Sequence, residues 1–221
     1  MTKLIGISGK PGSNKLPYAF RIIRELRVRG QRTNQVFLAQ PLYDELNGIA
    51  KALVTGEPAA KLIEDFNLGE KGKELLTLLG GDIGEFHPDY GLSRRNENVR
   101  KSLSLLGLGI RREQEPDYFV NRLGPQLEGL DFGVIADLRF PNEADHIRWG
   151  GGKTLRVEIN NPEDNSGGYK YEKGLEDPTE TALDDYPFFN WLFYRNNFDG
   201  IAFGRELEQA FELPALKEIV R

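Results

Sequence analysis

The stretch that most constrains this chain is a short glycine-rich turn between a strand pattern and a helix pattern. Residues 4–7 are an apolar run typical of a buried strand, and residues 9–14 then hold two glycines, a proline and a serine. After Lys15, apolar residues recur at the i, i+3, i+4 and i+7 spacing of one helix face. Strand, glycine turn, lysine and helix make the layout of a phosphate-binding loop, in which backbone N–H groups and a helix N-terminus surround an anion.

This loop departs at two positions from the usual G-x-x-x-x-G-K-[ST] pattern. Asn14 stands where the second glycine is expected, and Asn is the non-glycine residue that best tolerates positive φ. Leu16 stands where a Mg²⁺-binding hydroxyl is expected, and its side chain cannot coordinate a metal. A strand–helix turn without a ligand is the alternative interpretation. The residues predicted to bind a nucleotide are Gly9, Lys10, Gly12, Ser13, Asn14 and Lys15.

Composition excludes several classes of protein. Of the 221 residues, 39% are hydrophobic and 29% are charged, which is typical of a soluble globular protein. The net charge of −5 gives no overall attraction to nucleic acid or to anionic membranes. The apolar runs are far shorter than the ~18 residues of a membrane span, and the N-terminal run is too short for a signal peptide. Because cysteine is absent, disulfides and thiolate chemistry are excluded. We expect a cytoplasmic protein with no membrane partner.

Two groups of basic residues stand out in this acidic chain. Residues 21–32 hold five arginines on the outer side of the first helix pattern, which we interpret as a solvated face. Residues 94–112 hold six basic residues and one acidic residue. Arginine forks match phosphate oxygens, so this second group predicts a phosphate clamp, with an ordinary surface helix as the alternative. The glycine-rich segment 80–98 before it predicts a lid or substrate-binding insertion at about 80–125 within a single domain.

Asp137 directly follows the apolar run 134–136, so it stands at the carboxyl end of a predicted buried strand. Ligands bind at this end of the strands in open α/β sheets, and phosphate-loop proteins commonly hold Mg²⁺ with an Asp there. Arg139 lies two residues further on and points to the same side. Asn142 and Glu143 open the next helix. The alternative is a capping Asp137 with a structural ion pair to Arg139.

The remaining elements follow from apolar periodicity and from breaker residues. Further strands are predicted at 36–39, 154–159 and 198–203. Helices are predicted at 15–29, 42–53, 59–66, 69–79, 142–149 and 179–186, with one more near the C-terminus. The aromatic run 188–194 is interpreted as core or as a homodimer interface.

The sequence resembles the phage deoxynucleoside monophosphate kinase family at four places, in order along the chain. The Asp-x-Arg-x-x-Asn-Glu block that begins at Asp137 is the most specific of them. The other three are the glycine loop 4–15, the segment 99–112 followed by Asp117-Tyr-Phe-Val, and the segment 179–186 that begins Thr-Glu.

The resemblance implies an α/β fold like that of P-loop NTPases, with a parallel sheet, helices on both faces and inserted lid or substrate segments. It also implies transfer of the ATP γ-phosphoryl group to a deoxynucleoside 5′-monophosphate (dNMP), with ATP and Mg²⁺ as cofactors. Asp137 would hold the metal, and Lys15, Arg112 and Arg139 would be catalytic. The implied substrate-binding residues are Arg111, Arg112, Asp117, Arg139, Asn142 and Glu143. For a phage-encoded protein, the location would be the host cytoplasm.

Two other functions stay open. One is a kinase for a modified base within DNA, although the net acidic charge argues against strong nucleic-acid binding. The other is a catalytically inactive nucleotide-binding or structural protein, which Asn14 and Leu16 favour. The sequence leaves the base preference open in either case.

Overall fold

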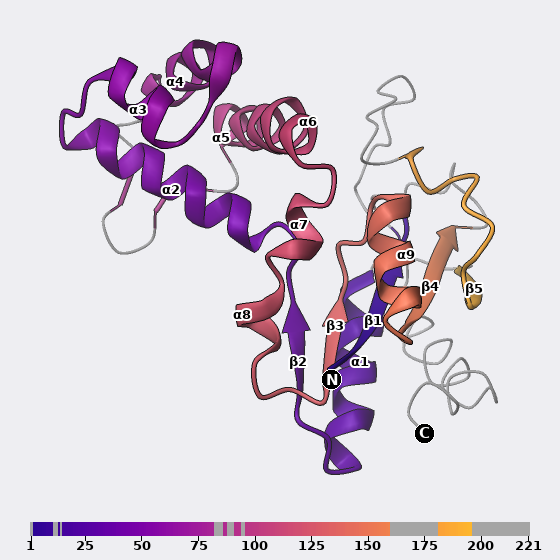
Figure 1. Cartoon of the computed structure of the whole chain (residues 1–221). Coiled ribbons are helices and arrows are strands. Elements are labelled where there is room, and N and C mark those ends of the chain that lie inside the picture. Colours follow the sequence, from indigo (N-terminus) through magenta and orange to yellow (C-terminus); the bar gives the residue numbers. More distant parts are fainter. Residues whose placement is uncertain are drawn as a thin grey trace. The chain divides into compact units, whose positions relative to one another are not determined.

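A computed structural model describes residues 2–10, 13, 15–81, 86–87, 91–93, 96–159 and 181–195. The chain divides into two units, which are described separately below (Figure 1). The first unit comprises Met1–Leu38 and Leu123–Arg221, and the second comprises Ala39–Arg122. The second unit thus includes most of the region where the sequence predicts an insertion, and it begins earlier, at Ala39.

The first unit is built on a five-stranded sheet with the strand order β2-β3-β1-β4-β5. All four pairings between neighbouring strands are parallel, so the predicted parallel α/β sheet is confirmed. Because the strands are parallel, their carboxyl ends share one edge of the sheet. The strands are β1 (Lys3–Ser8), β2 (Thr33–Val36), β3 (Phe132–Ile135), β4 (Lys153–Ile159) and β5 (Trp191–Arg195).

Helices cover both faces of this sheet, as predicted. Helix α1 (Lys15–Val28) lies on one face and α9 (Pro141–Trp149) on the other, while the short α8 (Gly124–Leu127) precedes β3 (Figure 1). A Cβ on Gly6 would lie 2.6 Å from Ile147 Cδ1, so this glycine lets α9 pack directly on the central strand. On the opposite face, α1 buries Tyr18, Ala19, Ile22, Ile23 and Leu26 against the strands.

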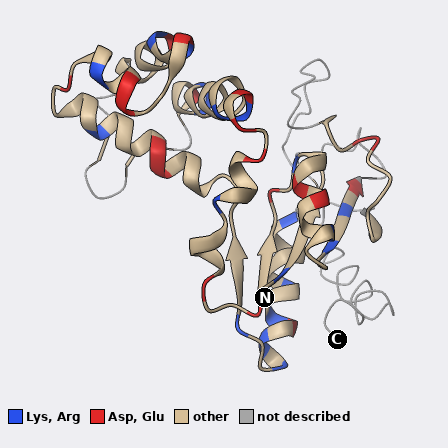
Figure 2. Cartoon of the chain, viewed as in Figure 1, with Lys and Arg blue, Asp and Glu red and all other residues tan. Residues whose placement is uncertain are grey.

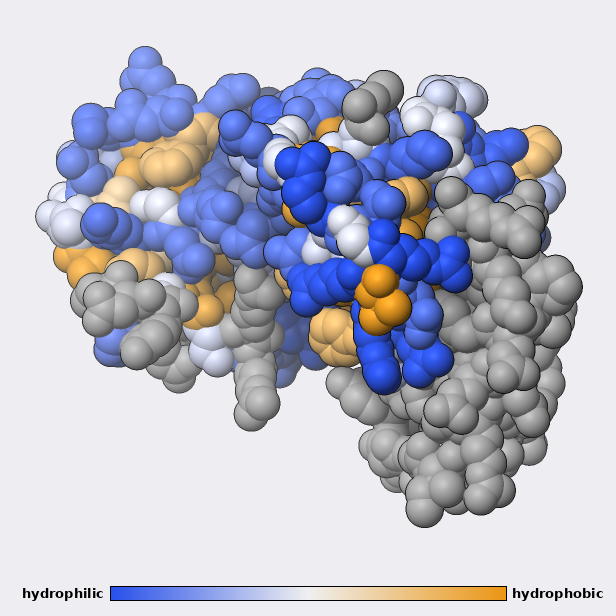
Figure 3. Space-filling model, turned by 90° about the horizontal axis from the view of Figure 1, so that it is seen from below, coloured by the Kyte–Doolittle hydropathy of each residue, from blue (hydrophilic) through white to orange (hydrophobic). Residues whose placement is uncertain are grey.

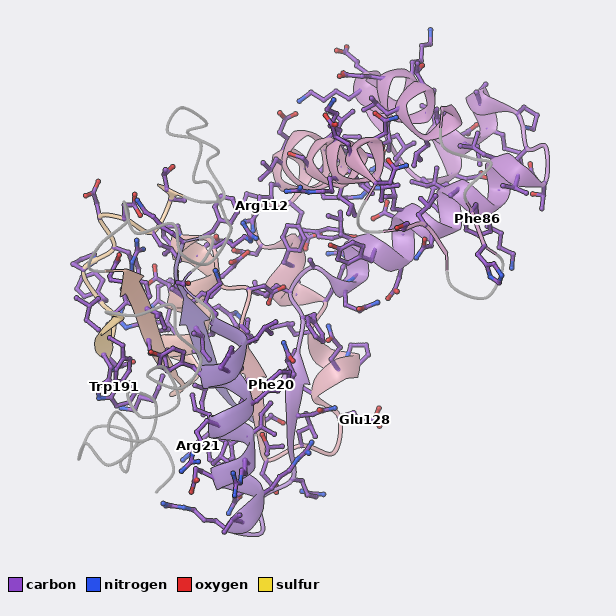
Figure 4. All side chains as sticks on the ribbon, turned by 180° about the vertical axis from the view of Figure 1, so that it is seen from behind. Phe20, Arg21, Phe86, Arg112, Glu128 and Trp191 are labelled. Atoms are coloured by element: carbon purple, nitrogen blue, oxygen red, sulfur yellow. The ribbon has the colours of Figure 1, made fainter. Side chains whose placement is uncertain are left out.

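The arginines of the first helix lie on its solvent side. Lys and Arg residues follow α1 in Figure 2, and hydrophilic residues gather around its lower end in Figure 3. Phe20 and Arg21 project from the side of α1 that faces away from the sheet (Figure 4). Arg21 Nε lies 3.1 Å from Glu25 Oε1, and Arg32 Nη2 lies 2.8 Å from Asp131 Oδ1. These ion pairs, one within the helix and one to Asp131 before β3, agree with the interpretation of a solvated face.

The second unit is mainly helical. Its α5 (Glu97–Ser104) is capped at the N-terminus by Asn96, whose side chain accepts hydrogen bonds from the N–H groups of Asn98 and Val99. A π-helical segment, η3, continues α5, and its Gly107 would place a Cβ only 3.0 Å from Leu42 Cδ2 of α2. The elements are α2 (Gln40–Val54), α3 (Ala59–Asp65), η1 (Gly69–Lys71), α4 (Gly72–Gly80), α5 (Glu97–Ser104), η3 (Leu105–Arg111), α6 (Arg112–Gln114) and α7 (Tyr118–Asn121).

Several predicted elements differ from the structure. The second strand is Thr33–Val36 rather than 36–39, because the polar residues before Val36 pair with β3 at the sheet edge. Part of the aromatic run forms β5, with Phe193 in the core. Residues 182–185 form turns where a helix was predicted. The predicted strand 198–203 and the C-terminal helix lie outside the described residues. Within the described part of the chain, no helix is long and apolar enough to cross a membrane.

Candidate phosphate-binding site

The loop after β1 has a defined turn at its start. The N–H of Ser13 donates to the Lys10 carbonyl at 3.1 Å. Lys15 Nζ donates to the Gly9 carbonyl and, at 3.4 Å, to the Lys10 carbonyl, so its ammonium group folds back over the loop. A Cβ on Gly9 would lie 2.6 Å from the Val157 carbonyl oxygen, which explains why glycine stands there. The predicted nucleotide-binding residues Gly12 and Asn14 lie outside the described residues.

A pocket at the carboxyl end of the strands begins at this loop. The lining residues are Ser8, Gly9, Lys15, Leu138, Arg139, Arg156 and Leu183. Three of them are cations, and none of them is a carboxylate. Lys15 and Arg139 give this lining a positive charge and N–H donors that match phosphate oxygens, while two carboxylates compensate the charge of Arg156. The structure therefore brings the predicted residues Gly9, Lys15 and Arg139 together at one pocket.

Arg156 is a pocket residue that the sequence reasoning missed. It lies on β4 with its side chain only 6% exposed. Its Nε donates to Glu158 Oε1, its Nη1 to the Leu183 carbonyl at 2.6 Å, and its Nη2 to Asp184 Oδ1 at 2.6 Å. Burial lowers the pKa of Arg156, but the hydrogen bonds to Asp184 and Glu158 leave it raised above its ordinary value. The available signal in the sequence was an arginine between the apolar Leu155 and Val157 of a predicted strand. A charge buried at such a position needs polar or charged partners.

Asp137 lies at the carboxyl end of β3, as the sequence predicts. Its Oδ1 accepts a hydrogen bond from the Leu38 N–H at 3.3 Å, which joins the ends of β2 and β3. In the loop after β1, Ser13 Oγ is buried and finds no hydrogen-bond partner among the described residues. These residues also contain no group of three or more His, Asp or Glu side chains that could hold a metal ion.

Glu143 fixes the segment that carries Arg139. Its buried carboxylate accepts the backbone N–H of Arg139 at 2.9 Å and that of Phe140 at 3.0 Å. This is a capping arrangement at the N-terminus of α9, where orphan N–H groups need acceptors. Asn142 lies half-buried in the same helical turn. For Glu143, these bonds favour a positioning role over the predicted substrate contact.

In the second unit, Arg111 belongs to a buried network. Its side chain is only 8% exposed, and its Nε donates to both carboxylate oxygens of Glu45 at 2.9 and 3.0 Å. Its Nη1 donates to the Asn67 carbonyl at 3.1 Å, and its Nη2 donates to the Phe66 carbonyl. The Tyr118 hydroxyl donates a hydrogen bond to Glu45 at 2.7 Å. Burial, and to a smaller extent this hydrogen bond, raise the pKa of Tyr118. These contacts favour a structural role for Arg111 over the predicted substrate contact.

Arg112 lies beside Arg111 in the chain but in a different environment. Its guanidinium stacks on the Phe119 ring, with 4.6 Å between the Cζ atom and the ring centroid. Its Nη1 donates to the Pro116 carbonyl at 3.4 Å (Arg112 is labelled in Figure 4). Asp117, also predicted to contact substrate, is exposed at the start of α7. The structure describes these residues only within the second unit, so their substrate roles stay predictions.

Comparisons with known proteins add little to this site. No protein-family model and no curated protein matches the chain. Among solved structures, the chain is similar to a shikimate kinase from Bacteroides thetaiotaomicron, with 12% sequence identity and a TM-score of 0.40. The alignment covers 95% of this chain and 97% of that chain. Similarity at this level carries no functional argument.

Proposed function

We propose that this protein is a phosphotransferase that moves the γ-phosphoryl group of ATP to a deoxynucleoside 5′-monophosphate. The observation that supports the proposal most is the strand–loop–helix from β1 to α1. It carries Lys15 at a pocket that is also lined by Arg139 and Arg156. Phosphoryl transfer needs positioning and charge neutralisation more than a covalent catalyst, and this pocket offers both. The dNMP acceptor itself comes from the resemblance of the Asp137 block.

Within this proposal, the loop would bind the donor phosphates. The Lys15 ammonium group, which now contacts the carbonyls of Gly9 and Lys10, would exchange these contacts for phosphate oxygens. Arg139 stands on a segment that Glu143 fixes through the backbone, so it would meet the transferring group with little reorganisation. Arg112 would bind the acceptor phosphate, as the basic segment 94–112 predicts.

Mg²⁺ would neutralise the phosphate charge. The residues fit such a role, because the loop holds the orphan Ser13 hydroxyl and a carboxylate, Asp137, stands at the strand end. Mg²⁺ keeps several waters and takes few protein ligands in phosphate sites, so two protein oxygens are enough. Leu16 supplies no oxygen, and we expect the metal to bind weakly for this reason.

A coupled ADP-release assay tests the proposal. It would be run against dAMP, dGMP, dCMP, dTMP and base-modified dNMPs, with duplex DNA that contains modified bases as a further acceptor. We expect turnover with at least one dNMP, and we expect Lys15→Ala to abolish it while leaving the far-UV circular dichroism unchanged. Turnover with modified DNA alone would favour the DNA-kinase alternative. If wild-type protein turns over none of these acceptors at any Mg²⁺ concentration, the proposed activity is wrong.

A Mg²⁺ titration of the same assay tests the metal assignment. Asp137→Asn should raise the Mg²⁺ concentration for half-maximal rate steeply or end activity, because it removes the only predicted carboxylate ligand. Leu16→Thr should lower that concentration, because it restores a hydroxyl after the lysine. A Mg²⁺ curve that does not move in Asp137→Asn contradicts the metal assignment and leaves the kinase proposal intact.

A further inference from the structure

Strand β4 forms the wall beside the glycine loop. Ser8, the last residue of β1, pairs with Arg156 in the parallel register, so the loop begins directly beside this arginine. The next loop residue, Gly9, approaches the backbone of Val157 so closely that a Cβ would lie 2.6 Å from its carbonyl oxygen. The start of the loop is thus packed against β4, and groups fixed to β4 can control its shape.

Asp184 links this wall to the loop with a single carboxylate. Its Oδ2 lies 2.9 Å from Lys10 Nζ on the loop, and its Oδ1 accepts a hydrogen bond from Arg156 Nη2 at 2.6 Å. Burial raises the pKa of Asp184, but the hydrogen bonds from Lys10 and Arg156 leave it below its ordinary value. The carboxylate is therefore ionised at neutral pH and holds one cation on each side.

The turn that carries Asp184 is itself anchored. Arg156 Nη1 donates to the Leu183 carbonyl at 2.6 Å, directly before Asp184 in the chain. Two residues after it, the Tyr186 hydroxyl donates to Asp145 Oδ1 on α9 at 2.6 Å. Because the turn is fixed on both sides, Asp184 can hold Lys10 in place rather than follow its motion.

We propose that Asp184 and Arg156 are positioning residues that hold the start of the glycine loop, at Gly9 and Lys10, in place for binding phosphate oxygens. Lys10 is the group through which they act on the loop. This inference rests on the proposed function, in which the loop binds the donor phosphates. A preorganised loop pays less ordering entropy on binding, so the link raises affinity without contact between Asp184 and the ligand. A carboxylate that merely competed with phosphate for Lys10 would have the opposite effect.

The experiment measures affinity for ATP and for tripolyphosphate, which has the phosphates without the base, by isothermal titration calorimetry on the full chain. The variant is Asp184→Asn, which removes the charge and keeps a hydrogen-bond acceptor for Arg156. The matched control is Asp185→Asn, which removes the same charge from the exposed neighbouring residue. We expect Kd to rise about fivefold for both ligands in Asp184→Asn, since a partly exposed ion pair contributes up to about 1 kcal/mol. The control should stay within about twofold of wild type.

A double-mutant cycle with Lys10→Gln separates positioning from a general loss of stability. In the Lys10→Gln background, the ammonium group that binds Asp184 is absent, so Asp184→Asn should cause no further change in Kd. In steady-state assays, Asp184→Asn should raise the KM for ATP and leave the KM for the dNMP unchanged. A simple structural role would weaken the fold equally in both backgrounds and would not produce this pattern.

Each outcome decides between the two hypotheses. If wild-type protein binds ATP, and Asp184→Asn binds it equally or more tightly, the positioning role is overturned and the proposed function stands. The positioning role is also overturned if Asp185→Asn loses as much affinity as Asp184→Asn, because the effect is then one of net charge. If wild-type protein binds neither ATP nor tripolyphosphate, both proposals are overturned.

Discussion

Replacing Arg111 and Arg112 by alanine, one at a time, should give opposite phenotypes from adjacent residues. Arg111 is buried against Glu45. Arg111→Ala leaves this carboxylate in a 15% exposed position, with the Tyr118 hydroxyl as its remaining hydrogen-bond donor among the described residues. Breaking a buried ion pair from one side costs about 3–5 kcal/mol, because a charge is left without compensation. For a unit of this size, that loss lowers the midpoint of thermal unfolding by roughly 15 °C or more.

Arg112→Ala is the matched control for stability. It removes the stacking of a half-buried guanidinium on Phe119, which contributes about 0.5–2 kcal/mol. If Arg112 binds the acceptor phosphate, the same substitution lowers turnover by several factors of ten and leaves the fold intact. The two neighbouring substitutions should therefore affect different properties, Arg111→Ala the stability and Arg112→Ala the activity.

The positions of the two tryptophans allow unfolding of the first unit to be followed separately. Trp149 and Trp191 both belong to the first unit, so tryptophan fluorescence reports its unfolding alone. Far-UV circular dichroism at 222 nm also reports the helices of the second unit. In urea titrations, Arg111→Ala should shift the dichroism transition to lower urea by an amount equivalent to at least 3 kcal/mol. A loss below about 1 kcal/mol would refute the structural role of Arg111.

Two further predictions concern the first unit. Gly9→Ala should abolish ATP binding in calorimetry with an unchanged far-UV spectrum, because its Cβ would lie 2.6 Å from the Val157 carbonyl oxygen; wild-type affinity in this variant would contradict the close packing of the loop. Hydrogen bonds from Arg32 lower the pKa of Asp131 from 3.8 to about 2, so this carboxylate stabilises the fold above pH 3.8 and loses that effect as the pH falls toward 2. Urea titrations at pH 5 and pH 2.5 measure the stability lost on acidification, and Asp131→Asn should lose less than wild type. Equal losses would show that the Arg32–Asp131 pair does not contribute to the stability of the fold.

Much of the sheet could be predicted from the sequence because its strands are buried on both faces. Short apolar runs identify the interior strands β1 and β3 in a parallel sheet. Strand β4 is recognised instead by the alternation of Leu155, Val157 and Ile159 with charged residues. The sequence predicts the edge strand β2 three residues too far toward the C-terminus, because residues 33–35 are polar and do not form an apolar run. The other edge strand, β5, was hidden in an aromatic run that also suits a core or an interface. Pattern alone does not distinguish these cases.

The candidate site could be predicted only where it is local in the sequence. Lys15 and Gly9 belong to one loop, so spacing alone brings them together. Arg156 and Asp184 lie 28 residues apart in the chain. Their contact forms only when the turn before β5 packs against β4. Arg111 shows the converse limit, because a basic segment predicts a phosphate clamp while Glu45, 66 residues earlier, already holds this guanidinium.

The position of the second unit in the chain has a consequence for how the protein folds. The Leu38 N–H and Asp137, which join the ends of β2 and β3, are 99 residues apart, and the whole of Ala39–Arg122 lies between them. Helices make mostly local contacts and form quickly, whereas pairing of distant parallel strands is slow. We therefore expect the helical unit to fold first, so that β2 and β3 meet across a folded segment rather than a long flexible chain. A substitution that destabilises this unit, such as Arg111→Ala, would then also slow the completion of the sheet in the other unit.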